Sequence, residues 1–322
     1  MSRRAAFLLL AALALAFALS LALPWSALLD IAGQDPDLAT ALLVELRLPR
    51  AALALIYGAM LGASGAAIQA LFANPLASPD LTGTTSGAAL GAVVTVYLLG
   101  FATPIALSIG AVVGALGTLG LLLLLAGPRA ETATLLLAGL AISALAGALT
   151  TLALALAPSP FAFYDAYDWL MGSLVDRSLA QTAFAGVPAF LAIGLLLRLA
   201  RPLDALALGE DVAQSLGHDV GRVRLQIICL TALGVGACVA ICGAIGFIGL
   251  VAPIFARRLT RAHPGRAMLP AAIIGAVLLL GADLLVRLAP LGRTLPIGVA
   301  TALLGAPFFL WLVTHLRWRL RS

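Results

Sequence analysis

The chain has 322 residues, of which 62% are hydrophobic and only 10% are charged, and its formal net charge is +5. This polar fraction is too small to cover a soluble globule of that size, so the composition excludes a water-soluble protein and predicts an integral membrane protein in contact with lipid. The basic residues other than histidine are all arginine. They are scattered over short loops without interleaved aromatic residues, which argues against a nucleic acid partner.

Apolar runs of about 20 residues, the length that crosses a bilayer, recur along the chain. Residues 81–126 are about twice too long for one crossing and have a natural break at 100–104. Residues 225–256 are also too long, and a series of glycines followed by Pro253 interrupts them. We predict an all-α membrane protein with one domain over residues 1–322 and ten transmembrane helices, at 5–23, 48–72, 81–100, 104–126, 133–157, 180–199, 225–243, 247–259, 269–286 and 295–313.

The first apolar run follows Ser2-Arg3-Arg4, which is typical of a secretory signal peptide, but it is longer than the usual hydrophobic region and has no small-residue cleavage site. We therefore expect residues 5–23 to be retained. With ten crossings, 14 of the 19 arginines fall on one side, and positive residues accumulate on the cytoplasmic side of a membrane. Both termini are thus predicted to be cytoplasmic, and five arginines are predicted to lie outside: Arg47, Arg50, Arg177, Arg287 and Arg293.

The second predicted helix has polar features that a simple membrane anchor does not need. It carries Gln69 and several glycines, and it ends at Asn74-Pro75, a helix-stopping pair. Polar side chains within a membrane usually face the protein interior or a water-filled cavity. We predict that this helix, through Gln69, lines a transport path.

The sequence contains little that could drive transport by itself. Ion-coupled carriers need ionisable groups inside the membrane, and the predicted helices offer only Asp283, four residues before Arg287 and therefore on the same helical face, where an ion pair is expected. Since the chain has no lysine, it has no phosphate-binding loop. If transport is active, its energy would come from another subunit. The alternatives are a gradient-driven secondary transporter and a membrane-embedded enzyme. The sequence offers no buried polar cluster that would indicate an enzyme.

The largest predicted cytoplasmic loop, residues 203–224, has the pattern of a docking segment. An apolar residue recurs every fourth position, with glycines between, so one apolar stripe is expected on a short helix or helix pair. The stripe consists of Leu208, Val212, Leu216 and Val220. An interfacial helix on the bilayer is the alternative, but the acidic residues of this loop disfavour it. We predict that the loop docks a partner subunit.

A weak internal repeat suggests that the two halves of the chain are related. At a constant offset, Gly65, Ala66 and Pro75 correspond to Gly243, Ala244 and Pro253. This offset matches the second helix to the seventh, so the two copies would cross the bilayer in opposite directions, as in the inverted repeats of many transporters.

Cysteines and histidines give no sign of a metal site or a cofactor. The three cysteines fall within one predicted helix, where they are expected to pack as small hydrophobic residues. The three histidines fall in three separate segments, so no ligand cluster is expected.

Several motifs in order along nearly the whole chain resemble those of FecCD-type permeases of ABC importers for ferric siderophores, haem and cobalamin. The motifs are Leu46–Arg50, Ser64–Phe72, Asn74–Ala77, Ser86–Ala88, Gly209–Gly217, Gly243–Leu250, Ala282–Arg287 and Leu295–Phe309. The resemblance implies a type II ABC importer permease fold in the bacterial inner membrane. It also implies a non-catalytic homodimer without cofactors, which works with two cytoplasmic ATPase subunits and a periplasmic substrate-binding protein.

The resemblance assigns roles to several residues. Arg47, Arg50 and Arg287 match positions that meet acidic residues of the binding protein, with lipid headgroups or intramolecular pairing to Asp283 as the alternative. Asn74 and Leu76 match the constriction at the cytoplasmic end of the path, with a plain helix stop as the alternative. The residues matching the ATPase-coupling helices are Leu208, Gly209, Glu210, Val212, Ala213, Leu216 and Gly217.

The sequence predicts less about the outer part of the transport path and about the identity of the substrate. Ser159 and Pro160, at the outer end of the fifth helix, are expected either to line a smooth path for a large chelate or to pack within a loop. Ala244 and Ile254 stand where many relatives have proline and histidine, so a histidine that handles metal there is not expected. Ferric siderophore is favoured as the substrate only by its frequency in the family, and haem and cobalamin stay open.

Overall fold

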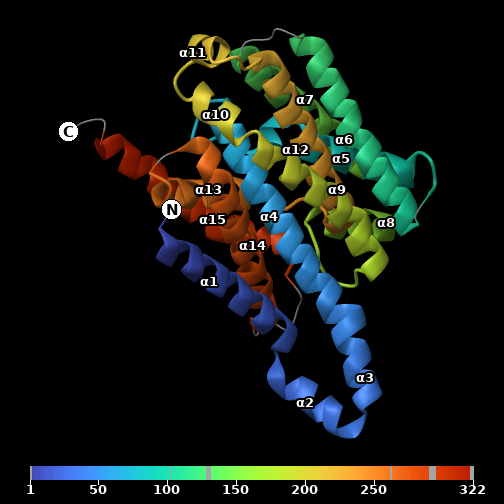
Figure 1. Cartoon of the computed structure of the whole chain (residues 1–322). Coiled ribbons are helices and arrows are strands. Elements are labelled where there is room, and N and C mark those ends of the chain that lie inside the picture. The colour runs from blue at the N-terminus through green and yellow to red at the C-terminus, as the bar shows by residue number, and fades with distance from the viewer. Residues whose placement is uncertain (1, 102, 128–131, 262, 290–294, 320–322) are drawn as a thin grey trace.

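The computed structural model describes residues 2–101, 103–127, 132–261, 263–289 and 295–319 (Figure 1). Within these ranges the chain consists of helices and turns, without a strand. The elements are α1 (Arg3–Ala22), α2 (Trp25–Gln34), α3 (Pro36–Ala41), the π-helical η1 (Leu42–Arg47), α4 (Leu48–Leu71), the 3-10 turn η2 (Pro79–Thr82), α5 (Thr84–Tyr97), α6 (Pro104–Ala126), α7 (Thr132–Ala155), α8 (Pro160–Leu170), α9 (Leu179–Arg198), α10 (Ala200–Leu206), α11 (Glu210–Ser215), α12 (Val220–Cys242), α13 (Ile248–Leu259), α14 (Pro264–Leu288) and α15 (Ile297–Arg319). Three arginines of the charge argument, Arg129, Arg293 and Arg321, lie outside the described residues.

Seven helices in the described part of the chain are long and apolar enough to cross a membrane. They are Arg3–Ala22, Pro36–Leu71, Ile105–Ala126, Ala133–Ala155, Leu179–Arg198, Val220–Cys242 and Pro264–Leu288. The other three predicted positions hold the shorter helix α5, the 12-residue α13 and α15, whose apolar stretch is Ile297–Phe308. The chain is therefore an all-helical, multi-pass membrane protein.

Helices α5 and α13 are short because the chain before each of them lies inside the bundle. Pro79 of η2 lies beside the middle of α4, since a Cβ atom added to Gly249 would stand 2.8 Å from Pro79 Cδ and 3.1 Å from the Leu61 carbonyl oxygen. Similarly, α12 ends at Gly243, and an irregular segment leads to Phe247, which has a φ of 65°. Irregular backbone is tolerated at membrane depth where protein surrounds it or where it lines a water-filled cavity, but not where it faces lipid.

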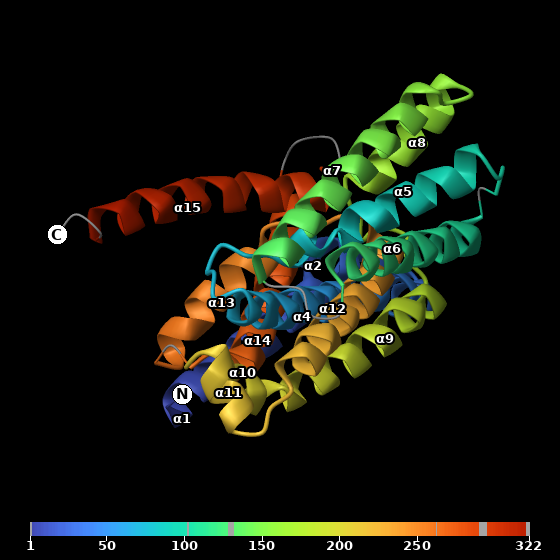
Figure 2. The same cartoon turned by 90° about the horizontal axis from the view of Figure 1, so that it is seen from above.

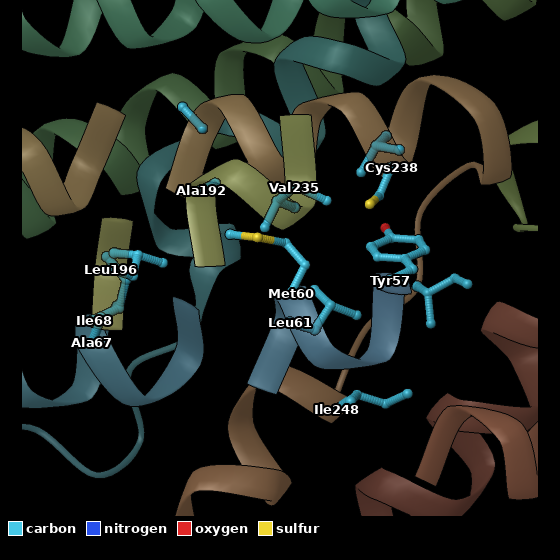
Figure 3. Packing of buried hydrophobic residues seen from close by; sticks show 14 of the residues in the cluster. Tyr57, Met60, Leu61, Ala67, Ile68, Ala192, Leu196, Val235, Cys238 and Ile248 are labelled. Carbon is cyan, nitrogen blue, oxygen red and sulfur yellow. The ribbon is translucent and has the colours of Figure 1, made fainter. Parts of the chain in front are cut away.

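Helix α4 is the centre of the bundle, and it is buried along most of its length. Where it crosses α14, Gly58 faces Gly275 and Gly62 faces the Ala271 backbone, so closely that a Cβ atom would overlap the opposite helix. Small residues permit such close approach of helices in membranes. On another side, Tyr57 and Met60 pack against α9 and α12 (Figure 3).

The segment between the first two membrane helices, expected to be a connecting loop, is instead a helical hairpin. Helices α2 and α3 pack against each other, and α3 continues through η1 into α4 (Figure 1). We call residues 24–46 the hairpin, and the end of the bundle that carries it the hairpin end. The opposite end carries α10 and α11 and is called the loop end.

Helix α15 differs from the other long helices in its position. It extends away from the bundle (Figure 2), and within the described residues it packs against α13 and α14. Leu303, Leu304 and Leu310 on it are exposed. These exposed leucines leave an apolar surface for another molecule or for lipid.

Candidate transport site and coupling loop

The three arginines predicted to dock a partner lie together at the hairpin end, around the carboxylate of Asp283. Arg50 holds this carboxylate with a 2.7 Å contact from Nη2 and with hydrogen bonds of 2.8 and 3.1 Å from Nε. Asp283 is 1% exposed and Arg50 is 18% exposed. This fork-like geometry is the strong form of an ion pair, and it joins the beginning of α4 to the end of α14.

Arg47 and Arg287 bind the carboxyl-terminal end of α1. Arg47 Nη1 donates to the carbonyls of Leu21 and Ala22 at 2.8 and 2.9 Å. Arg287 Nη1 donates to the Ser20 carbonyl at 2.8 Å and lies 3.8 Å from Asp283. Cations are favoured at this end of a helix, where carbonyl groups lack intrahelical partners.

These contacts match the intramolecular alternative for Arg50 and Arg287, which pair with Asp283, whereas Arg47 engages α1 instead. Each of the three guanidinium groups therefore has a structural role within the chain. Docking of a binding protein by these arginines remains a prediction, and it would compete with these contacts.

Gln69 lies inside the bundle in this structure, and its place on a transport path remains a prediction. The side chain is fully buried, and its Nε2 donates to the Leu250 carbonyl at 3.1 Å. Gly65, one turn earlier, lies against the backbone of Gly249. The amide joins α4 to the first turn of α13. Gln69 Oε1 has no partner within the described residues.

Asn74 forms the turn that ends α4. Its Oδ1 accepts from Leu76 N at 2.9 Å, and its own N donates to the Gln69 carbonyl at 3.1 Å. This Asx-type geometry stops a helix and reverses the chain. The geometry therefore matches the helix-stop alternative. The side chains of Asn74 and Leu76 are half-buried at the loop end. A gating role for Asn74 and Leu76 remains a prediction.

Ser159 and Pro160 start α8. Ser159 Oγ accepts from Ala162 N at 3.2 Å, and Pro160 occupies the first helical position. Both are favoured residues for these positions. Ser159 is half-buried and Pro160 is exposed, so their local role is to begin a helix, and contact with a substrate remains a prediction.

The segment after α8 fastens two distant helices, which the sequence does not indicate. Ser173 N donates to the Cys242 carbonyl at 2.8 Å, at the end of α12. Ile297 N and Gly298 N, at the start of α15, donate to the carbonyls of Gly172 and Met171 at 3.0 and 3.1 Å. The φ of 81° at Gly172 permits this path.

A second carboxylate, that of Asp80, lies within the bundle, and it was not predicted because Asp80 falls between two apolar runs. Asp80 Oδ1 accepts from Thr85 Oγ1 at 2.7 Å, and its carbonyl accepts from Ser143 Oγ of α7 at 3.2 Å. The carboxylate thereby fixes the start of α5. This position of Asp80 becomes evident only in the structure, where η2 lies inside the bundle.

In the loop of residues 203–224, the predicted apolar stripe is only partly present. Leu208, Val212 and Leu216 are exposed, whereas Val220 is buried with Ala213 and Ala205. The reason is that Gly209 and Gly217 have φ angles of 112° and 84° and turn the chain, so a spacing of four residues does not keep one face. The exposed apolar surface therefore consists of Leu208, Val212 and Leu216.

Two polar contacts fix this loop to the membrane helices. Glu210 pairs with the buried Arg224 of α12 at 2.7 Å. Asp204 Oδ1 accepts from Gly265 N at 2.9 Å and so caps α14. A cavity of about 660 Å³ opens beside the pair, between α11, α12 and the loop-end residues of α6 and α7. These two contacts connect α10 to α14 and α11 to α12.

The described residues contain no group of three or more His, Cys, Asp and Glu side chains that could hold a metal ion. The three cysteines form no disulfide, and Cys238 and Cys242 are buried. Cys238 packs beside Tyr57 in the core (Figure 3).

Comparison with known proteins gives consistent matches over most of the chain. The model of the FecCD transport family matches residues 6–315. The vitamin B12 import system permease protein BtuC of Vibrio cholerae is 41% identical over 84% of this chain and 82% of that protein, and BtuC of Klebsiella pneumoniae is 42% identical over 85% and 83%.

Solved structures agree with this result. A metal-chelate type ABC transporter in an inward-facing conformation superposes with a TM-score of 0.87 at 31% identity, covering 98% of this chain and 100% of that one. PsaBC from Streptococcus pneumoniae, at 19% identity and a TM-score of 0.54, shares the fold. The chain therefore belongs to the FecCD transport family, and it is a non-catalytic transmembrane permease subunit of an ABC transporter.

Proposed function

We propose that this permease carries vitamin B12, a cobalt chelate, into the cell with energy from ATP hydrolysed by partner subunits. The observation that supports this substrate is the 41–42% identity to vitamin B12 import permeases across more than four fifths of the chain. This favours cobalamin, the alternative substrate left open above, over ferric siderophore, the substrate first expected. The metal-chelate type transporter with a TM-score of 0.87 supports the broader class of substrate.

The proposed topology has ten crossings with both termini in the cytoplasm. Helices α5, α13 and α15 supply the three crossings beyond the seven long helices. Two segments support an inverted repeat, because α4 with α5 and α12 with α13 share one plan: a long helix, an irregular turn inside the bundle and a shorter helix. In this orientation the hairpin end is periplasmic and the loop end is cytoplasmic.

The proposed assembly contains two copies of this chain, two ATPase subunits and a periplasmic substrate-binding protein. The apolar surface of α15 offers a place for the second copy. The exposed Leu208, Val212 and Leu216 offer an apolar surface for the ATPase. Exposed apolar side chains of this kind are typical of helix-in-groove contacts between proteins.

The mechanism that the geometry supports is a rigid-body relay along α14. This helix has 25 residues and is therefore about 37 Å long. At the loop end it is capped by Asp204, and at the hairpin end it carries Asp283 and Arg287. A displacement of α10 by the ATPase would move α14 as a rod and change its contacts with α1 and α4. The turn at Asn74 and Leu76 would open or close the path at the cytoplasmic end.

The substrate is best tested on the binding protein encoded with this permease. Calorimetry with cyanocobalamin, haem and a ferric siderophore is expected to give tight binding for cyanocobalamin alone. Selective binding of the siderophore or haem would contradict the proposed substrate while leaving the family membership intact.

A further inference from the structure

The segment between α4 and α5 has one side that the described part of the bundle does not fully cover. In this segment Ala77 and Pro79 are buried, whereas Leu76, Ser78 and Asp80 are half-buried. Burial thus alternates from residue to residue, and the half-buried side chains belong to the uncovered side. Among them, Asp80 is the one that carries a charge.

Asp80 lies far from either surface of the membrane. A Cβ atom added to Gly249 would stand 2.8 Å from the neighbouring Pro79 and 3.1 Å from the Leu61 carbonyl oxygen, so this part of the segment lies beside the middle of α4. Leu61 precedes the end of α4 at Leu71 by ten residues, which corresponds to about 15 Å along the helix axis. Since the hydrocarbon core is about 30 Å thick, Asp80 lies close to its mid-plane.

Asp80, Thr85 and Ser143 form a small polar patch at this depth. Thr85 Oγ1 donates to Asp80 Oδ1 at 2.7 Å, and Ser143 Oγ of α7 donates to the Asp80 carbonyl at 3.2 Å. The three residues are half-buried. Among the residues that the structure describes, Asp80 makes no ion pair. Its charge is therefore not neutralised by a described arginine, in contrast to that of Asp283.

The polar patch is unsuited to contact with lipid. Ionisable side chains near the centre of a bilayer face the protein interior or a water-filled cavity, because their exposure to hydrocarbon is costly. Non-helical backbone at this depth is subject to the same restriction. A half-buried carboxylate without a cationic partner on an irregular segment meets both conditions where water reaches it. Asn74 and Leu76, the predicted constriction, precede it on the same segment.

We propose that Asp80 lines the transport path and selects the substrate there, because its carboxylate accepts hydrogen bonds from side-chain amides of cobalamin and repels chelates that carry anionic groups. This inference rests on the proposed function, since it names a residue of the permease that favours cobalamin. The position is deeper in the membrane than the predicted constriction at Asn74 and Leu76, so a substrate would pass Asp80 before it reaches the cytoplasmic end.

A carboxylate distinguishes chemically between the substrates left open above. Cobalamin carries amide groups around its corrin ring, and their N–H groups form charge-assisted hydrogen bonds with a carboxylate. Haem carries propionates, and many ferric siderophore complexes are anionic, so Asp80 repels them, more strongly than in bulk water because protein of low dielectric constant surrounds the path. Specificity is often built in this way, from an attractive contact with one ligand and a repulsive contact with its competitors.

The first test measures uptake into proteoliposomes that contain the permease–ATPase complex, with ATP inside and loaded binding protein outside. The substrates are cyanocobalamin and its monocarboxylic acids, in which one side-chain amide is replaced by a carboxylate. Initial rates are compared at equal saturation of the binding protein, so that the selectivity of that protein does not enter. We expect the wild-type complex to transport cyanocobalamin about tenfold faster than the acids.

The variants of the first test separate the charge of Asp80 from its structural role. Asp80→Asn removes the charge but keeps an oxygen that accepts from Thr85, so the start of α5 is preserved. This variant should transport cyanocobalamin and the acids at similar rates. Asp80→Glu keeps the charge and should keep the preference for cyanocobalamin. The control Asp168→Asn removes an exposed carboxylate of α8 and should also keep the preference.

The second test asks whether water reaches position 80, and it does not depend on the substrate. The complex is placed in nanodiscs after its native cysteines have been replaced by alanine. In this background Asp80→Cys should react with a membrane-impermeant methanethiosulfonate reagent. Two control variants should not react: Ala77→Cys, which is buried on the other side of the segment, and Val113→Cys, which is exposed on the apolar surface of α6. Basal ATPase activity and thermal unfolding show whether each variant is folded.

The outcomes separate this inference from the proposed function. An unreactive Asp80→Cys in a folded complex, or a reaction no faster than that of Ala77→Cys, would overturn the place of Asp80 on the path. A wild-type preference retained by Asp80→Asn would overturn its role in selection. If Asp80→Cys reacts but the wild-type complex takes up no cyanocobalamin, the proposed substrate and the amide contact are both wrong, whereas the place of Asp80 on the path is supported.

Discussion

The ion pair between Arg50 and Asp283 permits a quantitative prediction about the hairpin end. Asp283→Ala leaves Arg50 and Arg287 facing each other without the carboxylate that both contact. Arg50→Ala leaves Asp283 with Arg287, although at 3.8 Å. Breaking a buried ion pair by removing one partner costs about 3–5 kcal/mol. We therefore expect about 5 kcal/mol for Asp283→Ala and about 3 kcal/mol for Arg50→Ala.

The assay is equilibrium unfolding of the purified permease in mixed micelles, with the double variant Arg50→Ala/Asp283→Ala completing a thermodynamic cycle. The double variant should lose less than the sum of the single variants, with a coupling of about 2 kcal/mol. Arg50→Leu/Asp283→Leu, which replaces the pair by apolar side chains, should be milder than Asp283→Ala alone. A loss below about 1 kcal/mol for Asp283→Ala, or a larger loss for Arg50→Ala, would refute this reasoning.

Three further predictions concern packing, capping and coupling. Gly62→Ala should lower the unfolding temperature because its Cβ meets the Ala271 backbone, whereas Gly194→Ala, which has open space, should not; equal temperatures would exclude the close contact of α4 and α14. Asp204→Ala should lower the free energy of unfolding by about 1 kcal/mol, because α14 loses its cap. The same variant should reduce the stimulation of ATPase activity by loaded binding protein. Full stimulation would contradict the relay through α14. Leu216→Asp should weaken ATPase binding in a pull-down titration by about tenfold. The control Gln214→Glu adds the same charge to a neighbouring exposed position and should leave the affinity unchanged. Equal affinities of the two variants would show that Leu216 is not part of the ATPase surface.

Much of the fold is predictable because membrane helices are specified by local hydrophobicity. Lipid offers no partners for backbone polar groups, so each long apolar run has to be helical. This is why helices occur at all ten predicted positions. The hairpin was not predicted, since α2 and α3 are short and Pro24 and Pro36, which are also typical of turns, stand at their starts.

The candidate site was less predictable because roles depend on what surrounds each side chain. Gln69 was identified by its polarity within an apolar helix, but its hydrogen bond to the Leu250 carbonyl depends on the packing of α4 against α13. Val220 fits a stripe by spacing, but Gly209 and Gly217 rotate the chain between the stripe residues. In contrast, the pairing of Asp283 with Arg287 follows from a spacing of four residues on one helix and was expected, whereas the contact with Arg50 required the crossing of α4 and α14.

The central claim, that this chain forms the path of an ATP-driven vitamin B12 importer, is tested most directly by uptake into proteoliposomes. The permease is reconstituted with its ATPase, loaded with ATP inside and supplied outside with binding protein and radiolabelled cyanocobalamin. The account predicts accumulation that requires ATP and binding protein, and that persists when an uncoupler abolishes the proton gradient. Uptake driven by a proton gradient without ATP, or transport of a ferric siderophore with no uptake of cyanocobalamin, would contradict it.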